Sequence, residues 1–319
     1  MKIRHTLYTA FAVTLICAAG QGCINDLPRV EIVEQEGGFL FRECDRDIMF
    51  YQREPKSIAG EYTRCNYIHP LYGLDGEVLT EDFPADHLHH RGIFWAWHQL
   101  YRDDRRLGDG WSIDRIAWRV QEVRIFQTRD RSATLSANVT WHSPVQAPPV
   151  VLERTLITVH PSTARSQAID FQIHLLALEE NVRLGGSDDE KGYGGFSLRI
   201  RLPEDTRFIG PDGEVVPQNT PVSACPWLDV MATFSPGADR SGVAVLIHPQ
   251  TPGYPQPWIL RRKGSMQNPV FPGRQPVLLS REQPLVLRYR ILLHRGGGDA
   301  ETMQRAWRCY ADCRAVDML

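Results

Sequence analysis

Four of the chain's eleven histidines lie in one stretch, FPADHLHHRGIFWAWHQL, residues 83–100. Three of them, His87, His89 and His90, fall within four residues and run into Arg91. Histidine exchanges protons near neutral pH and binds metals as a neutral ring. Burying such a polar cluster costs desolvation free energy that simple packing does not require, so we interpret the stretch as a functional site. If it is a strand, His87, His89 and Arg91 share one side and His90 points to the other.

Acid–base chemistry on an oxygen-rich ligand is the leading hypothesis for these residues. We predict that His90 and His248 act as acid and base, and that Arg91 and Lys191 stabilise negative charge developing on oxygen. The four catalytic candidates should line one pocket, because a sandwich brings loops from distant parts of the sequence to one rim. The groups predicted to orient the substrate are Asp86, His87, His89, Trp95, Asp170 and Trp258.

A metal site is an alternative interpretation of the same stretch. His87 and His89 could both reach one ion from the same side of a strand. The sequence does not assign a third ligand, which would come from His98, His174, His248, His294, Glu153 or Asp170. No zinc, P-loop, dinucleotide-binding or nucleophile-elbow motif occurs. We therefore expect neither a tightly bound metal nor a cofactor.

Aromatic residues and two loops support a small-molecule pocket. Trp95, Trp97 and Trp111 follow the histidines, and flat indole faces suit the C–H faces of sugar rings. The loop GSDDEKGYGGF, residues 186–196, is rich in glycine and contains Lys191. The proline-rich segment IHPQTPGYPQPWILRRKG, residues 247–264, contains His248 and Trp258.

Strand periodicity dominates the rest of the chain. The segment SATLSANVTW, residues 132–141, alternates strictly between apolar and polar residues, which predicts a half-buried strand. Similar segments recur, separated by Gly, Pro and Asp, without crossover helices. Helical spacing appears at residues 300–315, after the candidate N-cap Asp299. We predict an all-β fold, a single large antiparallel β-sandwich domain over residues 23–319, with a short C-terminal helix.

The N-terminus has the layout of an export signal. A basic start, MKIRH, precedes the apolar run TLYTAFAVTLICAAG, which predicts a signal peptide over residues 1–22. Cys23 stands where a bacterial lipoprotein is acylated, so a membrane-anchored lipoprotein and a free periplasmic or secreted product are both open. The 36 Lys and Arg residues nearly balance the 38 Asp and Glu residues, with no long basic run, so nucleic acid is not an expected partner. Membrane contact is expected only through the lipid.

Six separated motifs, in order, resemble the PmoA-like domain family of unknown function, which carries the label "methane oxygenase PmoA". The motifs are YIHPLYGLDGEVLTEDFPADHLHHRGIFWAW, LERTLITVHPS, AIDFQIHLLAL, KGYGGFSLRI, GVAVLIHPQTPGYPQPWILR and LRYRILLHRG. The resemblance covers roughly residues 40–296. It implies a large β-sandwich like that of the galactose mutarotases and a role in carbohydrate metabolism.

Residues and resemblance together predict an exported carbohydrate-active protein. It would act on a sugar or an oxidised sugar by acid–base chemistry, as an epimerase, mutarotase, lyase or hydrolase does. A non-catalytic glycan-binding module is the alternative, and a metal-dependent oxygenase using His87 and His89 is the second alternative. The expected partner is a carbohydrate or sugar-derived small molecule.

Overall fold

The computed structural model describes residues 28–263 and 266–313. The predicted signal peptide and Cys23 lie outside these residues. Among the described residues, no helix is both long and apolar enough to cross a membrane.

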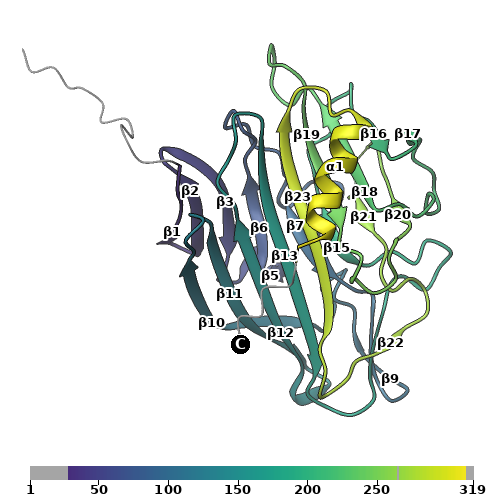
Figure 1. Ribbon diagram of the computed structural model, residues 1–319. Helices are drawn as coiled ribbons and strands as arrows, with labels where there is room; N and C mark the ends of the chain where they lie inside the picture. The colour runs from purple at the N-terminus through teal and green to yellow at the C-terminus, as the bar shows by residue number, and fades with distance from the viewer. Residues whose placement is uncertain (1–27, 264–265, 314–319) are drawn as a thin grey trace, which may run out of the picture.

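Two antiparallel sheets form the body of the protein (Figure 1). The larger sheet contains nine strands, in the spatial order β10 (Ala117–Gln127), β11 (Ala133–Ser143), β12 (Gln146–Val159), β13 (Ser166–Ala177), β23 (Leu285–Arg295), β19 (Ser241–Ile247), β18 (Trp227–Ala232), β16 (Arg207–Gly210) and β17 (Gly213–Glu214). The other contains six, in the order β1 (Val30–Gln35), β2 (Gly38–Glu43), β3 (Arg46–Gln52), β6 (Tyr67–Leu71), β7 (Ile93–Ala96) and β15 (Gly195–Leu198). The predicted all-β sandwich is confirmed.

Three smaller sheets lie around this body. One contains β22 (Val277–Leu278), β14 (Val182–Gly185), β8 (Gln99–Arg102) and β9 (Arg105–Gly108). The two-stranded pairs are β20 (Trp258–Ile259) with β21 (Asn268–Pro269), and β4 (Lys56–Ile58) with β5 (Glu61–Arg64). The loops that connect these short strands supply the polar residues discussed below.

The main core lies between the two large sheets, and strand alternation builds it. Along β11 the apolar residues Ala133, Leu135, Ala137, Val139 and Trp141 are all buried in this core, as the periodicity predicts. The six-stranded sheet alternates in the same way. Ile68, Ile93 and Trp95 face the main core, whereas Tyr67, Phe94 and Ala96 belong to a second apolar cluster. That second cluster therefore covers the outer face of the six-stranded sheet.

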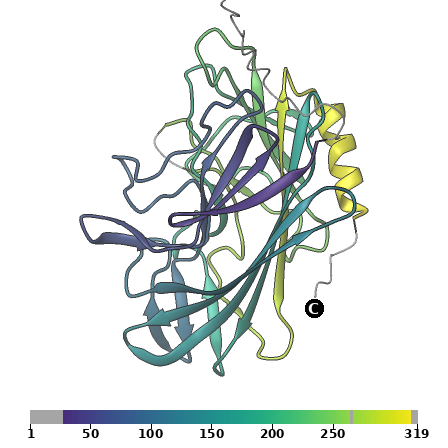
Figure 2. The ribbon, with the colours of Figure 1, turned by 90° about the vertical axis from the view of Figure 1, so that its left-hand side faces the viewer.

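The C-terminal helix α1 (Ala300–Ala311) covers the outer face of the nine-stranded sheet (Figure 2). The predicted cap is confirmed, because Asp299 Oδ1 accepts a 2.7 Å hydrogen bond from the backbone N–H of Thr302. Met303 and Tyr310 pack against a cluster that includes Trp227 and Leu246. The short helix and its place at the end of the chain match the sequence prediction.

Candidate functional site

The part of the histidine-rich stretch that holds His87, His89 and His90, residues 83–92, is a turn-containing loop before β7, so the strand geometry considered from the sequence does not apply to it. Two tight turns set its path: the N–H of His87 donates to the Pro84 carbonyl (3.0 Å), and the N–H of His90 donates to the His87 carbonyl (2.8 Å). These local bonds use backbone groups that a strand would offer to its neighbour. The turns also bring the three imidazole rings together, whereas a strand would place His90 on the side opposite to His87 and His89. The His87 and His90 rings stack at 4.7 Å between centroids, and the His89 ring stands edge-on to His90 at 4.6 Å.

Arg91 holds this loop from beneath and is not among the residues that line the pocket described below. Its guanidinium donates to the Leu88 carbonyl (2.8 Å), to the His90 carbonyl (3.2 Å) and to the Tyr62 carbonyl. The same group lies 3.4 Å from the centre of the Phe83 ring and pairs with Asp82. Because Arg91 is fully buried in these contacts, the structure gives it a positioning role.

Arg199 holds the same loop from the side. It donates to Asp86 (2.6 Å) and to Glu81 (2.7 Å), and its Nη1 lies 3.5 Å from Nδ1 of His90. Burial alone would raise the pKa of Asp86, but the hydrogen bonds from Arg199 and His87 outweigh it and lower that pKa to about 2. Asp86 is therefore ionised, and it orients His87 at the rim.

A pocket of about 270 Å³, called the histidine pocket below, opens beside this loop. Its lining comes from five separate segments and consists of His87, His89, His90, His98, Trp111, Ser112, Lys191, Tyr193, Arg261 and Met266. Trp111, Met266 and Tyr193 also belong to the apolar cluster on the outer face of the six-stranded sheet. The pocket thus combines an apolar floor with polar side chains from loops, which is the usual composition of a small-molecule site.

His98, between β7 and β8, forms a hydrogen-bonded pair with Asp109. Nδ1 of His98 lies 2.9 Å from Oδ2 of Asp109. An ionised carboxylate can only accept hydrogen bonds, so this contact favours the tautomer in which Nδ1 carries the proton and Nε2 keeps its lone pair. Nε2 is buried and has no hydrogen-bond partner among the described residues. The His98 ring stacks on Trp111 and meets Tyr193 edge-on, at 5.4 and 4.8 Å between centroids.

Asp109 is held in place by the turn that contains it. The backbone N–H groups of Trp111 and Ser112 both donate to Oδ1 at 2.9 Å, and Arg106 donates to Oδ2 at 3.2 Å. Burial raises the pKa of Asp109, but the bond and charge of His98, with the bonds from Ser112, lower it overall. The Asp109 carboxylate is therefore ionised and fixes the orientation of the His98 ring.

The half-buried imidazole of His89 and the buried imidazole of His90 are neutral. Burial, followed by the charges of nearby side chains, lowers the pKa of His89 to about 4 and that of His90 to about 2. At pH 7 both rings can donate and accept hydrogen bonds but carry no charge. A ring with a pKa of about 2 holds a proton too weakly to pass it to a substrate near neutral pH, so the structure favours a binding role for His90.

The predicted grouping of His90, Arg91, Lys191 and His248 in one pocket is right for His90 and Lys191 only. Arg91 lies under the loop, and His248 lies at the C-terminal end of β19. There His248 contacts Arg288 (3.1 Å), the Cys313 carbonyl (3.1 Å) and the Tyr310 ring. It is separated from the histidine pocket because β19 and β23 carry it to the sheet face covered by α1.

Three predicted substrate-binding residues also lie outside the pocket. Asp170 forms a bidentate ion pair with Arg290 (2.5 and 2.7 Å) and contacts His160 (2.9 Å). The other two are core residues whose indole N–H groups are satisfied internally. Trp95 donates to the buried Glu153 (2.7 Å), and Trp258 donates to the Cys225 carbonyl (3.2 Å). By contrast, His87 and His89 line the pocket, and Asp86 supports His87 at its rim.

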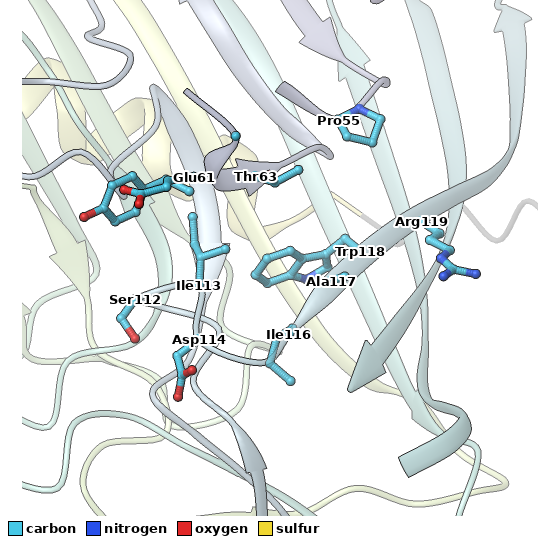
Figure 3. A pocket seen from close by; sticks show the side chains of 12 residues that line it. Pro55, Glu61, Thr63, Ser112, Ile113, Asp114, Ile116, Ala117, Trp118 and Arg119 are labelled. Carbon is cyan, nitrogen blue, oxygen red and sulfur yellow. The ribbon is translucent and has the colours of Figure 1, made fainter. Parts of the chain in front are cut away.

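A second, larger hollow of about 680 Å³ shares Ser112 with the histidine pocket. Figure 3 shows the Trp118 indole in its middle, with Thr63 of β5 above and Ile116 below. Its charged lining residues are Glu61, Asp114 and Arg119. We take the smaller histidine pocket as the functional site, because only the smaller one contains imidazoles and a carboxylate-oriented His98.

The sequence points to His87, His89, His90 and Lys191 in this pocket, but it suggests His98 only as a metal ligand and does not point to Asp109 or Tyr193. A sequence signal exists for Asp109: it stands between two glycines in GDGW, a typical tight turn in which Asp caps backbone N–H groups. Among the described residues, no group of three or more His, Cys, Asp and Glu side chains is placed to hold a metal ion.

Comparison with known proteins identifies the family of this chain. A family model described as "Family of unknown function (DUF6807)" matches residues 41–308, which include the whole histidine pocket. No curated protein matches the chain. The chain therefore belongs to this family of unknown function.

Proposed function

We propose that this family member binds a sugar, or an oxidised sugar, in the histidine pocket and transforms it by acid–base chemistry. The observation that carries the proposal is the His98–Asp109 pair. It leaves Nε2 of His98 buried and without a hydrogen-bond partner among the described residues, and His98 lines the pocket together with Trp111 and Tyr193. Buried polar atoms without partners are uncommon in proteins, and catalytic groups are among the exceptions.

In this proposal His98 is the general base. Its Nε2 lone pair accepts a proton from a sugar O–H or C–H, and Asp109 stabilises the imidazolium that forms. In the second half of the reaction the imidazolium gives a proton back to the substrate or to its leaving oxygen, and exchange of that proton with solvent before it returns introduces deuterium in deuterated water. Tyr193 supplies a hydroxyl, and neutral His89 and His90 supply hydrogen bonds to sugar hydroxyls.

The finer family relationship remains a proposal. The ordered motifs resemble the PmoA-like proteins and imply a relationship to the galactose mutarotases, which is consistent with a sandwich and a sugar site. Export through a signal peptide over residues 1–22, with or without lipid on Cys23, belongs to the same proposal. Mass spectrometry of the exported protein checks it: an intact Met1 would overturn it, and a start at or near Cys23 would support it.

The decisive experiment measures proton exchange in deuterated water. Purified protein is incubated with glucose, galactose, mannose and their uronic acids, and proton NMR follows loss of C–H signals and formation of products. Wild type should exchange or convert at least one sugar, and His98→Gln should lower the rate by about a hundred-fold to ten-thousand-fold. His142→Gln is the matched control, because His142 lies on β11 and is not among the residues that line the pocket, and its ring forms a hydrogen bond with the Thr140 hydroxyl.

The alternative, a non-catalytic glycan-binding module, predicts a different result. Sugars would then bind with measurable heat, but wild type would neither exchange their C–H protons nor convert them. His98→Gln would weaken binding only. If none of these sugars binds or reacts, the proposed substrate class is wrong.

A further inference from the structure

The lining of the histidine pocket contains positively charged side chains but no negatively charged ones. Lys191 and Arg261 contribute positive charge, and no Asp or Glu occurs among the lining residues. The carboxylates just behind the wall are already engaged, Asp109 by His98 and Arg106, and Asp86 by Arg199. Positive side chains line the pocket, and the nearby carboxylates are paired with other side chains, so the pocket favours a negatively charged ligand.

Arg261 has hydrogen-bond donors that the protein does not use. Nη1 donates to the carbonyls of Gln218 (2.6 Å) and Leu260 (2.9 Å), and Nη2 donates once, to Asn219 (2.9 Å). A guanidinium has five N–H donors. Two of them, the Nε N–H and one N–H of Nη2, therefore have no acceptor among the described residues. None of the acceptors of Arg261 is a carboxylate, so its charge is not neutralised by an ion pair there.

Elsewhere in this molecule two arginines bind a carboxylate through their Nε and Nη2 atoms. Arg290 donates from Nε and Nη2 to the two oxygens of Asp170, and Arg207 donates from both atoms to Glu214. The Arg290–Asp170 pair has the usual bidentate geometry between guanidinium and carboxylate, whereas both donors of Arg207 reach the same oxygen, Oε2 of Glu214. Arg261 lines the pocket, and its Nε and Nη2 atoms offer the corresponding donors. The hydrogen bonds from its guanidinium to three backbone carbonyls already fix the position of this group.

A buried arginine behind the pocket strengthens the positive field. Arg64 donates to the Gly110 carbonyl at 2.5 Å and lies 4.2 Å from the centre of the Trp118 ring. It forms no ion pair within the described part of the chain. Lys191 is only weakly neutralised, because its 3.6 Å contact with Asp189 is exposed to solvent.

We propose that the ligand carries a carboxylate, as uronic and aldonic acids do, and that Arg261 binds this carboxylate with help from Lys191. This inference rests on the proposed sugar function of the pocket and narrows its substrate class. The cavity of about 270 Å³ lies near the lower end of small-molecule sites, about 300 Å³, and therefore suits a single sugar unit.

Titration calorimetry with paired ligands tests the proposal. D-galacturonate is compared with D-galactose, and D-glucuronate with D-glucose, so each pair differs at one carbon. For wild type we expect at least one uronate to bind ten-fold or more tightly than its neutral partner, with a loss of affinity as salt is added. Arg261→Gln should abolish that preference, and Arg261→Lys, which keeps the charge but not the fork, should retain part of it.

Arg262→Gln is the matched control. Arg262 is the next residue, is similarly charged and donates to the Thr206 carbonyl (2.9 Å) outside the pocket. Its replacement should leave the preference for uronate unchanged. Thermal unfolding of each variant shows whether the tether of Arg261 to residues 218 and 219 is needed for folding, and Arg261→Lys keeps the test valid if Arg261→Gln fails to fold.

The outcomes separate this inference from the proposed function. Equal affinity for neutral and acidic sugars, unchanged in Arg261→Gln, would overturn the carboxylate assignment and leave the sugar site standing. Binding of neither class would overturn both. A uronate preference that is lost equally in Arg262→Gln would place the anion site outside the histidine pocket and also contradict the inference.

Discussion

Asp109 fixes His98, a residue of the histidine pocket, through a 2.9 Å contact between Oδ2 and Nδ1, and Nε2 of His98 has no hydrogen-bond partner among the described residues. Two backbone N–H groups and Arg106 hold the carboxylate, which means that the orientation of the imidazole is set before any ligand binds. Preorganisation of this kind is what a general base requires, because reorientation during the reaction would add to the barrier.

Asp109→Asn tests the role of the carboxylate. An amide can donate to Nδ1, which would move the ring proton to Nε2 and remove the basic lone pair from the pocket. We expect turnover to fall by about a hundred-fold to ten-thousand-fold while calorimetric sugar affinity changes little. Asp104→Asn, at an exposed carboxylate that pairs with Arg183, is the control and should retain full activity. Full activity of Asp109→Asn would remove the pair from the mechanism.

Arg91→Gln should act on stability and not directly on chemistry. Arg91 is fully buried, pairs with Asp82 and holds three backbone carbonyls, so its loss leaves buried groups unpaired. Urea unfolding should show a loss of about 3–5 kcal/mol in the free energy of unfolding. Arg115→Gln, at an exposed residue that pairs with Asp114, should change it by less than about 0.5 kcal/mol. An Arg91→Gln protein of normal stability but without turnover would restore the catalytic role predicted from the sequence.

His90→Gln should change how stability depends on pH. The folded pKa of His90, about 2, lies below its ordinary value of 6.5, so only the unfolded chain gains this proton between those values. The contribution of His90 to stability is therefore complete above pH 6.5 and is lost as the pH falls, at about 1.4 kcal/mol per pH unit. Replacing His90 removes this pH-dependent contribution to the free energy of unfolding. The stability difference between wild type and variant should shrink between pH 6.5 and 5, and parallel curves would contradict the assignment.

Trp95→Phe tests whether Trp95 belongs to the core or to the ligand site. Its indole N–H is one of four donors to Glu153, together with Trp141, Asn66 and Thr155. Losing one donor to a fully buried carboxylate should cost about 1–3 kcal/mol in chemical unfolding. Sugar affinity should stay within experimental error of wild type. A selective loss of affinity would instead support the substrate-binding role predicted from the sequence.

The sandwich could be predicted because its strands are regular. In β11 every second residue is apolar and buried, and Asp299 caps α1 as its position suggests. The turns at residues 83–92 were harder to predict, because alternating His and Leu in HLHH imitate a strand. Local bonds from His87 to Pro84 and from His90 to His87 decide the conformation there.

The site could be predicted only in part. A dense cluster such as His87, His89 and His90 stands out in a sequence, and these residues do line the pocket. His98 is a single histidine beside two short strands, and nothing in the sequence shows that it meets Asp109, eleven residues away. Arg261 and Arg262 are adjacent and chemically identical. Only the fold places one in the pocket and the other against Thr206.

The most direct test of the central claim follows the imidazole nitrogens themselves. Nitrogen NMR of protein labelled at histidine reports the protonation and hydrogen bonding of each ring, and His98→Gln assigns the His98 signals. Addition of D-galacturonate should shift the Nε2 resonance of His98, with smaller shifts for His89 and His90, and leave His142 unchanged. Saturable binding of the sugar without any change at His98 would contradict a sugar site built around this base.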